Sequence, residues 1–181
     1  MKLEKTPLNG LMLIRPNRVS DLRGYFVRTY CWQTFRDWDV PFEPVQCSDS
    51  FNMQRHTLRG LHFQTAPNEE SKLVRCSGGA VFDVAVDLRE QSPRFGSWYG
   101  VVLSAENGLS LFIPRGFAHG FQTLEDRSTV QYFIDTPYQP GHSAGIRWDD
   151  PDIAINWPDA ESRIISDRDR SLPYLHDFKV P

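Results

Sequence analysis

The fold is decided by the stretch Gly108-Leu-Ser-Leu-Phe-Ile-Pro114-Arg-Gly116-Phe-Ala-His119. An apolar run leads into a Pro-x-Gly turn, and a second run carries His119 away from that turn. Proline and glycine supply the backbone angles that tight turns need, and apolar runs bounded by such residues are typical of β-strands. The stretch therefore predicts a strand, a turn and a return strand that carries His119.

Short β-like runs rich in Val, Phe, Tyr and Leu recur along the rest of the chain. They predict strands over Gly10–Ile14, Tyr25–Tyr30, Lys72–Cys76, Ala80–Val86, Trp98–Leu103, Leu109–Ile113 and Val130–Ile134. Only Cys31–Trp38 favours a helix. Strands without intervening helices favour an antiparallel sandwich or barrel. Since no repeat or linker is present, we expect an all-β protein with a few short peripheral helices, and one domain spanning residues 1–181.

Composition and charge narrow the class of protein. The 181 residues are 40% hydrophobic and carry a formal net charge of −3, which indicates a globular chain without the basic stripe of a nucleic-acid binder. No stretch approaches the ~18 apolar residues of a membrane span, and the N-terminus lacks an apolar signal region. Three widely spaced cysteines, Cys31, Cys47 and Cys76, fit reduced packing residues in a cytoplasmic protein.

Side-chain alternation indicates polar groups inside the barrel. In an extended strand, every second residue faces the same side. Within Val81–Asp87, this places Asp83 among small apolar side chains, where a carboxylate needs a partner or a wet cavity. Within Leu58–Gln64, His62 lies opposite two bulky apolar residues, and Tyr132 shares a face with apolar neighbours. The pattern favours a ligand-holding interior, although alternation alone leaves open edge strands with one solvated face.

The opening stretch resembles the second sequence motif of the cupin family. Its spacing of glycine, five residues, Pro-x-Gly, two residues and histidine matches, although Thr123 replaces the final asparagine. Metal-binding cupins also need a His-x-His pair and a glutamate, whereas this chain has His62-Phe63-Gln64. Because a metal cage would then have too few ligands, we predict no metal site.

A closer resemblance runs from Leu11 to Pro173. The chain is similar to the dTDP-4-dehydrorhamnose 3,5-epimerase family, with the motifs in the family's order. The matching segments are Leu58-Arg-Gly-Leu-His62-Phe-Gln64, Lys72-Leu-Val-Arg75, Asp83-Val-Ala-Val-Asp87-Leu-Arg89, Ser92-Pro-Arg-Phe-Gly-Ser-Trp98, Ile113-Pro-Arg-Gly-Phe-Ala-His119-Gly-Phe121, Trp148-Asp-Asp-Pro151, Ile155-Asn-Trp-Pro158 and Ile165-Ser-Asp-Arg-Asp169.

This resemblance implies a cupin jelly-roll barrel that forms a homodimer and binds a small-molecule nucleotide sugar. It also implies a catalytic set consisting of His62 with Asp169 as base, Tyr132 as acid and Lys72 near the sugar carbonyl. Substrate-binding roles carry over to Arg23, Gln46, Arg59, His119, Tyr138 and Arg168. From the residues alone, Tyr138 could simply pack a turn, and Asp167 competes with Asp169.

Three substrate-binding positions depart from the family pattern. Arg28 and Ser143 stand where glutamate is common, and Ser48 stands where asparagine is common. None belongs to the acid–base set. The departures therefore leave the type of reaction intact and bear on the identity of the nucleotide or sugar.

The implied residue types suit proton abstraction beside a ketone. A carbonyl at C4 acidifies the protons on C3 and C5, and inversion needs a base and an acid on opposite faces of the ring. Histidine titrates near neutral pH, an aspartate can hold its tautomer, and a lysine can stabilise the enolate oxygen. No cofactor is expected, because this chemistry needs none and the chain lacks a nicotinamide-binding glycine fingerprint.

We therefore interpret the chain as an isomerase, a carbohydrate epimerase that converts dTDP-4-dehydro-6-deoxyglucose to dTDP-4-dehydrorhamnose. Three alternatives stay open. The enzyme could invert only C3 or only C5, the barrel could be a metal-dependent oxygenase, or it could bind sugars without catalysis. The incomplete ligand set disfavours the oxygenase, and the complete His–Asp–Tyr–Lys set disfavours the binder.

Overall fold

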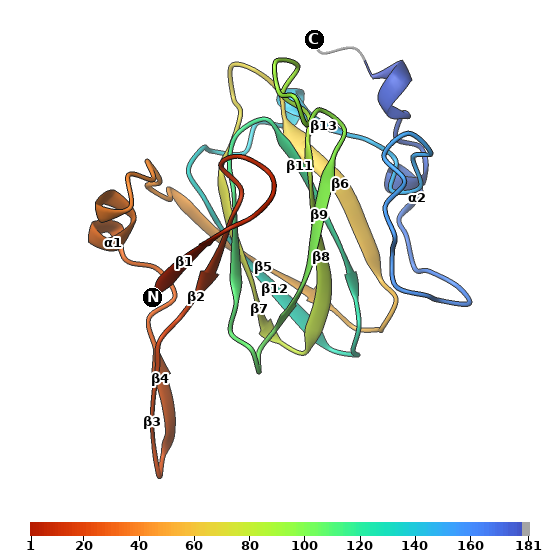
Figure 1. Cartoon of the computed structure of the whole chain (residues 1–181). Coiled ribbons are helices and arrows are strands. Elements are labelled where there is room, and N and C mark those ends of the chain that lie inside the picture. Colours follow the sequence, from red (N-terminus) through yellow and green to blue (C-terminus); the bar gives the residue numbers. More distant parts are fainter. Residues whose placement is uncertain (179–181) are drawn as a thin grey trace.

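The computed structural model describes residues 1–178 and consists mainly of two antiparallel β-sheets that face each other (Figure 1). The six-stranded sheet has the order β1 (Lys2–Lys5), β2 (Met12–Arg15), β10 (Ser110–Ile113), β7 (Lys72–Gly78), β12 (Ser128–Ile134) and β5 (Gln46–Asn52). The five-stranded sheet has the order β13 (Ser143–Gly145), β6 (Leu58–Gln64), β11 (Phe117–Thr123), β8 (Ala80–Asp87) and β9 (Trp98–Ser104).

The helices are short and lie at the periphery of this sandwich (Figure 1). They are α1 (Trp32–Asp37), α2 (Asp167–Arg170) and the 3-10 turns η1 (Pro140–His142) and η2 (Leu175–Asp177). None of the helices within residues 1–178 is long and apolar enough to cross a lipid bilayer. The predicted all-β jelly-roll barrel with few short helices is therefore confirmed.

The main core lies between the two sheets because each strand turns alternate side chains inward. Val74, Leu111 and Val130 of the six-stranded sheet pack in one cluster with Val81 and Phe121 of the five-stranded sheet. Tyr132 packs against this cluster from β12, as the alternation predicted. The centre of the barrel interior is therefore apolar, which leaves the ends of the barrel as the places for a polar pocket.

Two further clusters cover the outer faces of the sheets. Phe35 of α1 and Phe42 pack on Phe112 of the six-stranded sheet. Val84 and Val86 of β8 pack with Ile153 of the C-terminal segment on the other sheet. The C-terminal segment thus runs along the outside of the five-stranded sheet (Figure 1), which places α2 near β6.

The strand predictions are confirmed within about two residues at each end for β6 to β10 and for β12, and the predicted return strand that carries His119 is β11. The predicted strand Tyr25–Tyr30 is wrong in extent, since β4 covers Gly24–Val27. Gly10 lies before β2 in a left-handed turn conformation, with a φ of 83°. Four strands were not predicted, namely β1, β3, β5 and β13, because they are short or rich in polar residues.

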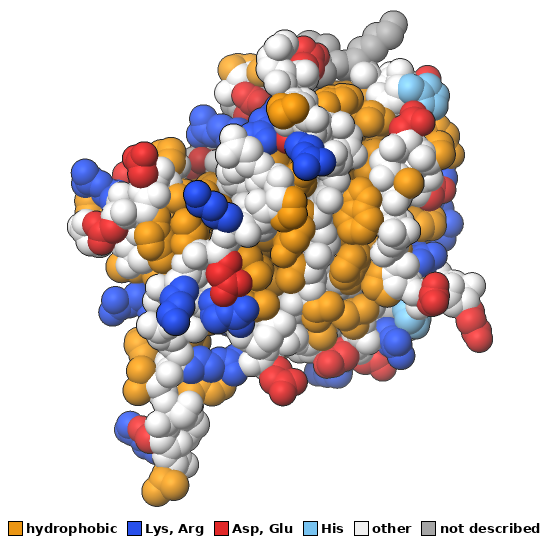
Figure 2. Space-filling view, viewed as in Figure 1, with side chains coloured by type: hydrophobic (Ala, Val, Ile, Leu, Met, Phe, Trp, Pro, Cys, Tyr) orange, Lys and Arg blue, Asp and Glu red, His pale blue; other side chains and the backbone are white. Residues whose placement is uncertain are grey.

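A hairpin of β3 (Arg18–Asp21) and β4 projects away from the body of the molecule (Figure 1). Its apolar side chains Val19, Leu22, Tyr25 and Phe26 are exposed, and the tip of the hairpin is hydrophobic in Figure 2. A hairpin of two strands is marginal in water by itself. The hairpin therefore presents an exposed apolar surface outside the body of the molecule.

Candidate active site

A pocket of about 470 Å³ opens at one end of the barrel, between the two sheets. The five-stranded sheet contributes Arg59, His62 and His119, and the six-stranded sheet contributes Lys72 and Tyr132. Its remaining predicted lining residues are Gln46, Ser48, Tyr138, Ser143 and Arg168. Although a larger depression of about 730 Å³ lies beside the C-terminal segment, this smaller pocket collects the predicted acid–base groups.

His62 and Asp169 form a hydrogen-bonded pair at the wall of the pocket. Nε2 of His62 donates to Oδ1 of Asp169 over 2.8 Å, and the second carboxylate oxygen accepts the backbone N–H of Gly60 at 3.1 Å. Because an ionised carboxylate can only accept, the proton lies on Nε2 and the lone pair on Nδ1. The half-exposed ring can therefore present a basic nitrogen to a ligand.

Burial raises the pKa of Asp169, but the hydrogen bond and charge of His62 outweigh it, together with the N–H of Gly60 and the hydroxyl of Ser166. The pKa of Asp169 is therefore lowered from its ordinary value of 3.8. Asp169 stays ionised at neutral pH, and it can stabilise an imidazolium on His62.

Asp169 reaches His62 because the C-terminal segment is tied to the start of β6. The backbone N–H of Leu58 donates to Ile164, and the N–H of Ile164 donates to His56. Ser166 then caps α2 by accepting the backbone N–H of Asp169. The sequence left Asp167 as a competitor, and the geometry selects Asp169.

His119 lies directly opposite His62 in the pairing of β11 with β6. Its Nε2 donates to Oδ2 of Asp83 at 2.8 Å, and both side chains are buried. The predicted need of Asp83 for a partner is thus confirmed. β6 and β11 approach each other closely at Gly60, where a larger residue would not fit, because its Cβ would lie 2.6 Å from the Cα of Gly120.

His62 and His119 each form a hydrogen bond with a carboxylate of their own, Asp169 and Asp83. Across residues 1–178, no three His, Cys, Asp or Glu side chains gather into a group able to hold a metal ion. Gln64 stands where a metal-binding cupin has a histidine, and it bonds protein groups instead. The donor set at this site therefore does not fit a metal cage.

Tyr132 reaches the pocket from β12, on the sheet opposite to that of His62. Its ring packs edge-on against the ring of His119, with 5.7 Å between centroids. Burial raises the pKa of Tyr132 strongly, and the charge of Asp83 raises it further. The phenol therefore carries its proton at neutral pH and can donate it.

Lys72 begins β7 with its side chain buried in the pocket. Its ammonium lies 2.8 Å from Oε1 of Glu70 and donates to the backbone oxygen of His62 over 3.4 Å. A buried ammonium needs such partners, because leaving water is costly for a charge. Lys72 thus adds a positive charge between the two sheets.

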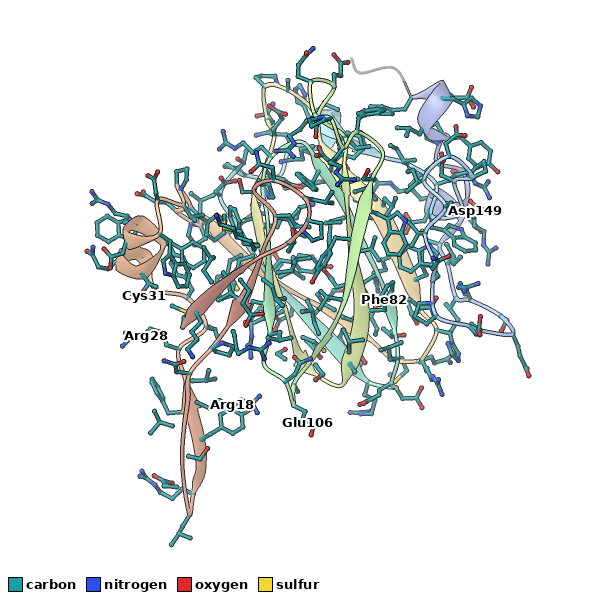
Figure 3. The ribbon with its side chains drawn as sticks, in the orientation of Figure 1. Arg18, Arg28, Cys31, Phe82, Glu106 and Asp149 are labelled. Carbon is teal, nitrogen blue, oxygen red and sulfur yellow. The ribbon has the colours of Figure 1, made fainter. Side chains whose placement is uncertain are left out.

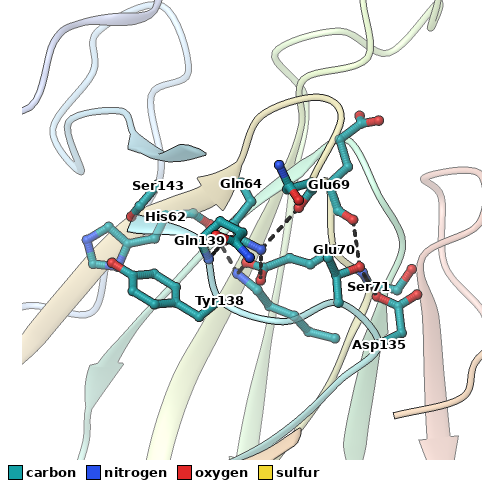
Figure 4. Close-up of polar contacts among 12 residues, drawn as sticks. His62, Gln64, Glu69, Glu70, Ser71, Asp135, Tyr138, Gln139 and Ser143 are labelled. Carbon is teal, nitrogen blue, oxygen red and sulfur yellow. Dashed lines mark hydrogen bonds and ion pairs between the residues drawn. The ribbon is translucent and has the colours of Figure 1, made fainter. Parts of the chain in front are cut away.

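Hydrogen bonds between segments that are distant in the sequence hold the mouth of the pocket. Oε1 of Gln46 accepts the backbone N–H of Tyr138, and Arg168 donates to the hydroxyl of Ser143. Arg59 donates from Nε to Asn52, which directs its guanidinium along the pocket wall. Figure 4 places the ring of Tyr138 beside His62 and Ser143 at this mouth.

Two predicted binding residues do not line this pocket. Arg23 sits on the projecting hairpin and pairs with Asp21, and its side chain is 90% exposed. Arg28 follows β4 and is exposed near α1 (Figure 3). Neither residue lines the pocket, because β3 and β4 leave the body of the molecule, and a ligand contact for either residue stays a prediction.

Three residues of the site were not predicted as such. Glu70 and Gln64 line the pocket, and Asp83 supports His119 from behind. Alternation singled out Asp83 as a buried carboxylate without indicating its partner. Lys72 begins β7, and Glu70 stands two residues before it. Because alternate residues of an extended chain face the same side, this spacing could have placed Glu70 beside Lys72.

Comparisons with known proteins agree with this geometry. Residues 5–177 match the sequence profile of the family described as dTDP-4-dehydrorhamnose 3,5-epimerase. A relative of that name from Methanothermobacter thermautotrophicus is 46% identical over 97% of this chain and 95% of its own.

Two solved structures extend the comparison to bound ligands. A Legionella pneumophila 3,5-epimerase in complex with dTDP-4-keto-L-rhamnose superimposes with a TM-score of 0.94 at 36% identity, over 98% of this chain and 94% of its own. A 3′-monoepimerase from Streptomyces bikiniensis in complex with dTDP-quinovose gives a TM-score of 0.89 at 31% identity, over 94% of this chain and 86% of its own.

Proposed function

Because the chain belongs to the dTDP-4-dehydrorhamnose 3,5-epimerase family, we propose that it inverts C3 and C5 of dTDP-4-dehydro-6-deoxyglucose to give dTDP-4-dehydrorhamnose. The observation that carries this proposal is the arrangement of the acid–base groups. His62 with Asp169 enters the pocket from one sheet, while Tyr132 enters from the other. Inversion needs a base and an acid on opposite faces of the sugar ring, and two facing sheets supply them.

In the proposed reaction, Nδ1 of His62 removes the proton from C3 or C5. The electron pair of that C–H bond forms the C=C bond of an enolate, and the carbonyl π electrons move to the C4 oxygen. Lys72 stabilises the resulting negative charge, an effect often worth ~3 kcal/mol. Tyr132 then protonates the carbon from the opposite face, the C4 carbonyl reforms, and solvent restores both residues.

The nucleotide end of the substrate meets the mouth of the pocket. Arg59 and Arg168 carry positive charge there, which suits a diphosphate, because guanidinium groups bind phosphate oxygens in a bidentate manner. Gln46 and Ser48 offer hydrogen bonds, and the half-exposed Tyr138 offers an aromatic face to a base. Ser143 is engaged by Arg168, which supports a role for both in closing the mouth.

We also propose that the protein is a homodimer whose projecting hairpin packs on the second copy. The exposed apolar side chains of Val19, Leu22 and Phe26 support this, since such a patch is covered in stable assemblies. A hairpin docked in this way gives Arg23 and Arg28 a ligand to contact in the partner. Light scattering at micromolar concentration should give twice the chain mass of 20.9 kDa, and a monomer would contradict the proposal.

Inversion of one carbon only is the second candidate. The similarity to a 3′-monoepimerase favours it, because that protein shares the fold at 31% identity. Ser48 and Ser143, which depart from the common family pattern, both line the pocket. The two candidates differ in how many carbons exchange their proton with solvent.

One experiment tests the proposed function and separates these candidates. The enzyme is incubated with dTDP-4-dehydro-6-deoxyglucose in heavy water, and deuterium is located by NMR. Deuterium at both C3 and C5 supports the 3,5-epimerase, and deuterium at one carbon supports a monoepimerase. A substrate that stays free of deuterium would overturn both.

Three further expectations stay proposals. Activity without metal is expected from the donor set, and prolonged chelation should leave the rate unchanged. A cytoplasmic location is supported by three free cysteines, Cys31, Cys47 and Cys76. A single domain over residues 1–181 is supported by one uninterrupted family match over 5–177.

A further inference from the structure

Glu70 belongs to neither the predicted catalytic set nor the predicted binding set, yet its carboxylate lies inside the pocket. The side chains of Glu70 and Lys72 are each only 9% exposed, and their charged atoms are 2.8 Å apart. Of the described carboxylates, Glu70 is the one within 4 Å of the Lys72 ammonium. The Glu70 carboxylate could act only as a counter-ion for the buried Lys72 ammonium, or it could also orient that ammonium toward a ligand.

We propose that Glu70 is a positioning residue, which aims the Lys72 ammonium at the substrate carbonyl and, through Gln64, fixes the loop that carries Tyr138. The inference rests on the role of Lys72 in the proposed function. It assigns to Glu70 no contact with the substrate.

The first argument comes from the donors of Lys72. An ammonium has three N–H donors. The Lys72 ammonium forms an ion pair with Oε1 of Glu70 and donates an N–H to the backbone oxygen of His62. Among the described residues it has no further acceptor, and Lys72 lines the pocket. The two contacts thus hold the ammonium in place and leave it an N–H for a ligand oxygen.

The second argument is that Glu70 cannot easily move. On one side of it, the backbone oxygen of Glu69 accepts the hydroxyl of Thr136 at 2.9 Å. On the other side, the N–H of Ser71 donates to Asp135 over 2.7 Å. Figure 4 shows Glu69, Ser71 and Asp135 beside Glu70. Hydrogen bonds therefore fix the backbone on both sides of Glu70. The position of its carboxylate is set by these bonds, and the carboxylate in turn sets the position of the Lys72 ammonium.

The third argument is the link from Glu70 to Tyr138. Oε2 of Glu70 accepts the side-chain N–H of Gln64 at 3.0 Å. The same nitrogen donates to the backbone oxygen of Asn68 at 3.0 Å and makes a longer contact of 3.4 Å with that of Pro137, and the amide oxygen accepts the N–H of Gln139 at 2.6 Å. Gln64 thus bonds the residues on both sides of Tyr138, and it is buried. The carboxylate orients this amide and thereby the loop.

Charge and shape can be separated with two substitutions. Glu70→Gln keeps the shape and still offers an oxygen to Gln64, but it removes the charge that holds Lys72. Glu70→Ala removes both contacts. Glu69→Gln is the matched control, because its carboxylate makes no ion pair within residues 1–178 and points away from the cluster in Figure 4.

Steady-state kinetics with the 4-keto sugar tests the effect on Lys72. Glu70→Gln should lower kcat about tenfold and leave KM within about threefold, because the aim of Lys72 matters once charge develops in the transition state. In a Lys72→Met background, Glu70→Gln should change kcat by less than about twofold, since its effect runs through Lys72. An unchanged kcat in Glu70→Gln, or an equal fall in both backgrounds, would overturn the proposal.

Amide hydrogen exchange at Gln139 tests the loop without any need for turnover. Glu70→Ala should speed this exchange about tenfold, whereas Glu70→Gln and Glu69→Gln should leave it near the wild-type rate. Unchanged exchange in Glu70→Ala would overturn the link to Tyr138. A wild-type enzyme that exchanges no substrate proton would instead defeat the proposed function, and the amide experiment would still decide the role of Glu70.

Discussion

Two histidine–aspartate pairs lie side by side in this pocket, and they differ mainly in burial. His62–Asp169 and His119–Asp83 have the same N–O distance of 2.8 Å and stand on paired strands. The side chain of His62 is 36% exposed, whereas that of His119 is 4% exposed. The same chemical unit therefore serves different tasks. The open pair can take a proton from a ligand, and the closed pair supports the wall around it.

The two carboxylates, Asp169 and Asp83, also differ in how many hydrogen-bond partners they have. Asp169 is satisfied by His62, Gly60 and Ser166. Oδ1 of Asp83, in contrast, has no hydrogen-bond partner among the described residues. The charge of Asp83 instead acts on Tyr132, whose pKa it helps to raise. The buried pair thus lies beside the proposed acid, and the open pair contains the proposed base.

The largest expected effect comes from removing the open histidine. His62→Ala should lower turnover at least ~10²-fold, because general base catalysis contributes that much or more. The fold should persist, since the ring is half-exposed. Steady-state kinetics and circular dichroism check both statements. His176→Ala is a matched control, because His176 is exposed and lies outside this pocket. Near-normal turnover in His62→Ala would defeat the assignment.

The closed pair should matter more for stability. Asp83→Ala leaves a buried His119 without its acceptor, and breaking a buried pair costs about 3 kcal/mol. We expect the free energy of unfolding in urea to fall by about that amount. The matching Asp169→Ala change should cost less, because His62 can turn to solvent. Equal losses in both variants would show that burial does not separate the pairs.

A smaller effect, with a defined pH dependence, is expected for Asp169→Asn. The folded-state pKa of Asp169 lies below its ordinary value of 3.8, so its contribution to stability is complete above that pH and is lost as the pH falls through the lowered pKa. Asp169→Asn should therefore be destabilised by about 1 kcal/mol at pH 7. The gap to the wild type should close below pH 3.8. A gap that stays constant down to pH 2 would contradict this account.

Much of this comparison was visible in the sequence, because strand periodicity is strict. Alternation grouped Asp83 and Tyr132 with apolar neighbours and placed His62 opposite two bulky apolar residues, although it left open whether these faces were interior, and β6 has the predicted bounds Leu58–Gln64. The pairing of His119 with Asp83 was not visible, since strand register sets it and no local pattern encodes register.

Contacts between distant segments were also beyond reach of the sequence. Asp169 meets His62 across 107 positions, and only the resemblance to a family indicated that contact. Arg23 and Arg28 followed the same resemblance, but neither lines the pocket, because Arg23 lies on the projecting hairpin and Arg28 directly follows it. No local sequence pattern indicated that this hairpin leaves the body of the molecule.

The central claim is that the open pair removes a proton while Tyr132, beside the closed pair, returns one from the opposite face. The most direct test is Tyr132→Phe with the 4-keto sugar in heavy water, following deuterium uptake and inversion side by side by NMR. If the claim holds, His62 still exchanges the carbon-bound proton, and deuterium enters the substrate faster than inverted product appears. The loss should lie mainly in kcat. A fall of both rates by the same factor would contradict the claim and make Tyr138 the better candidate for the acid.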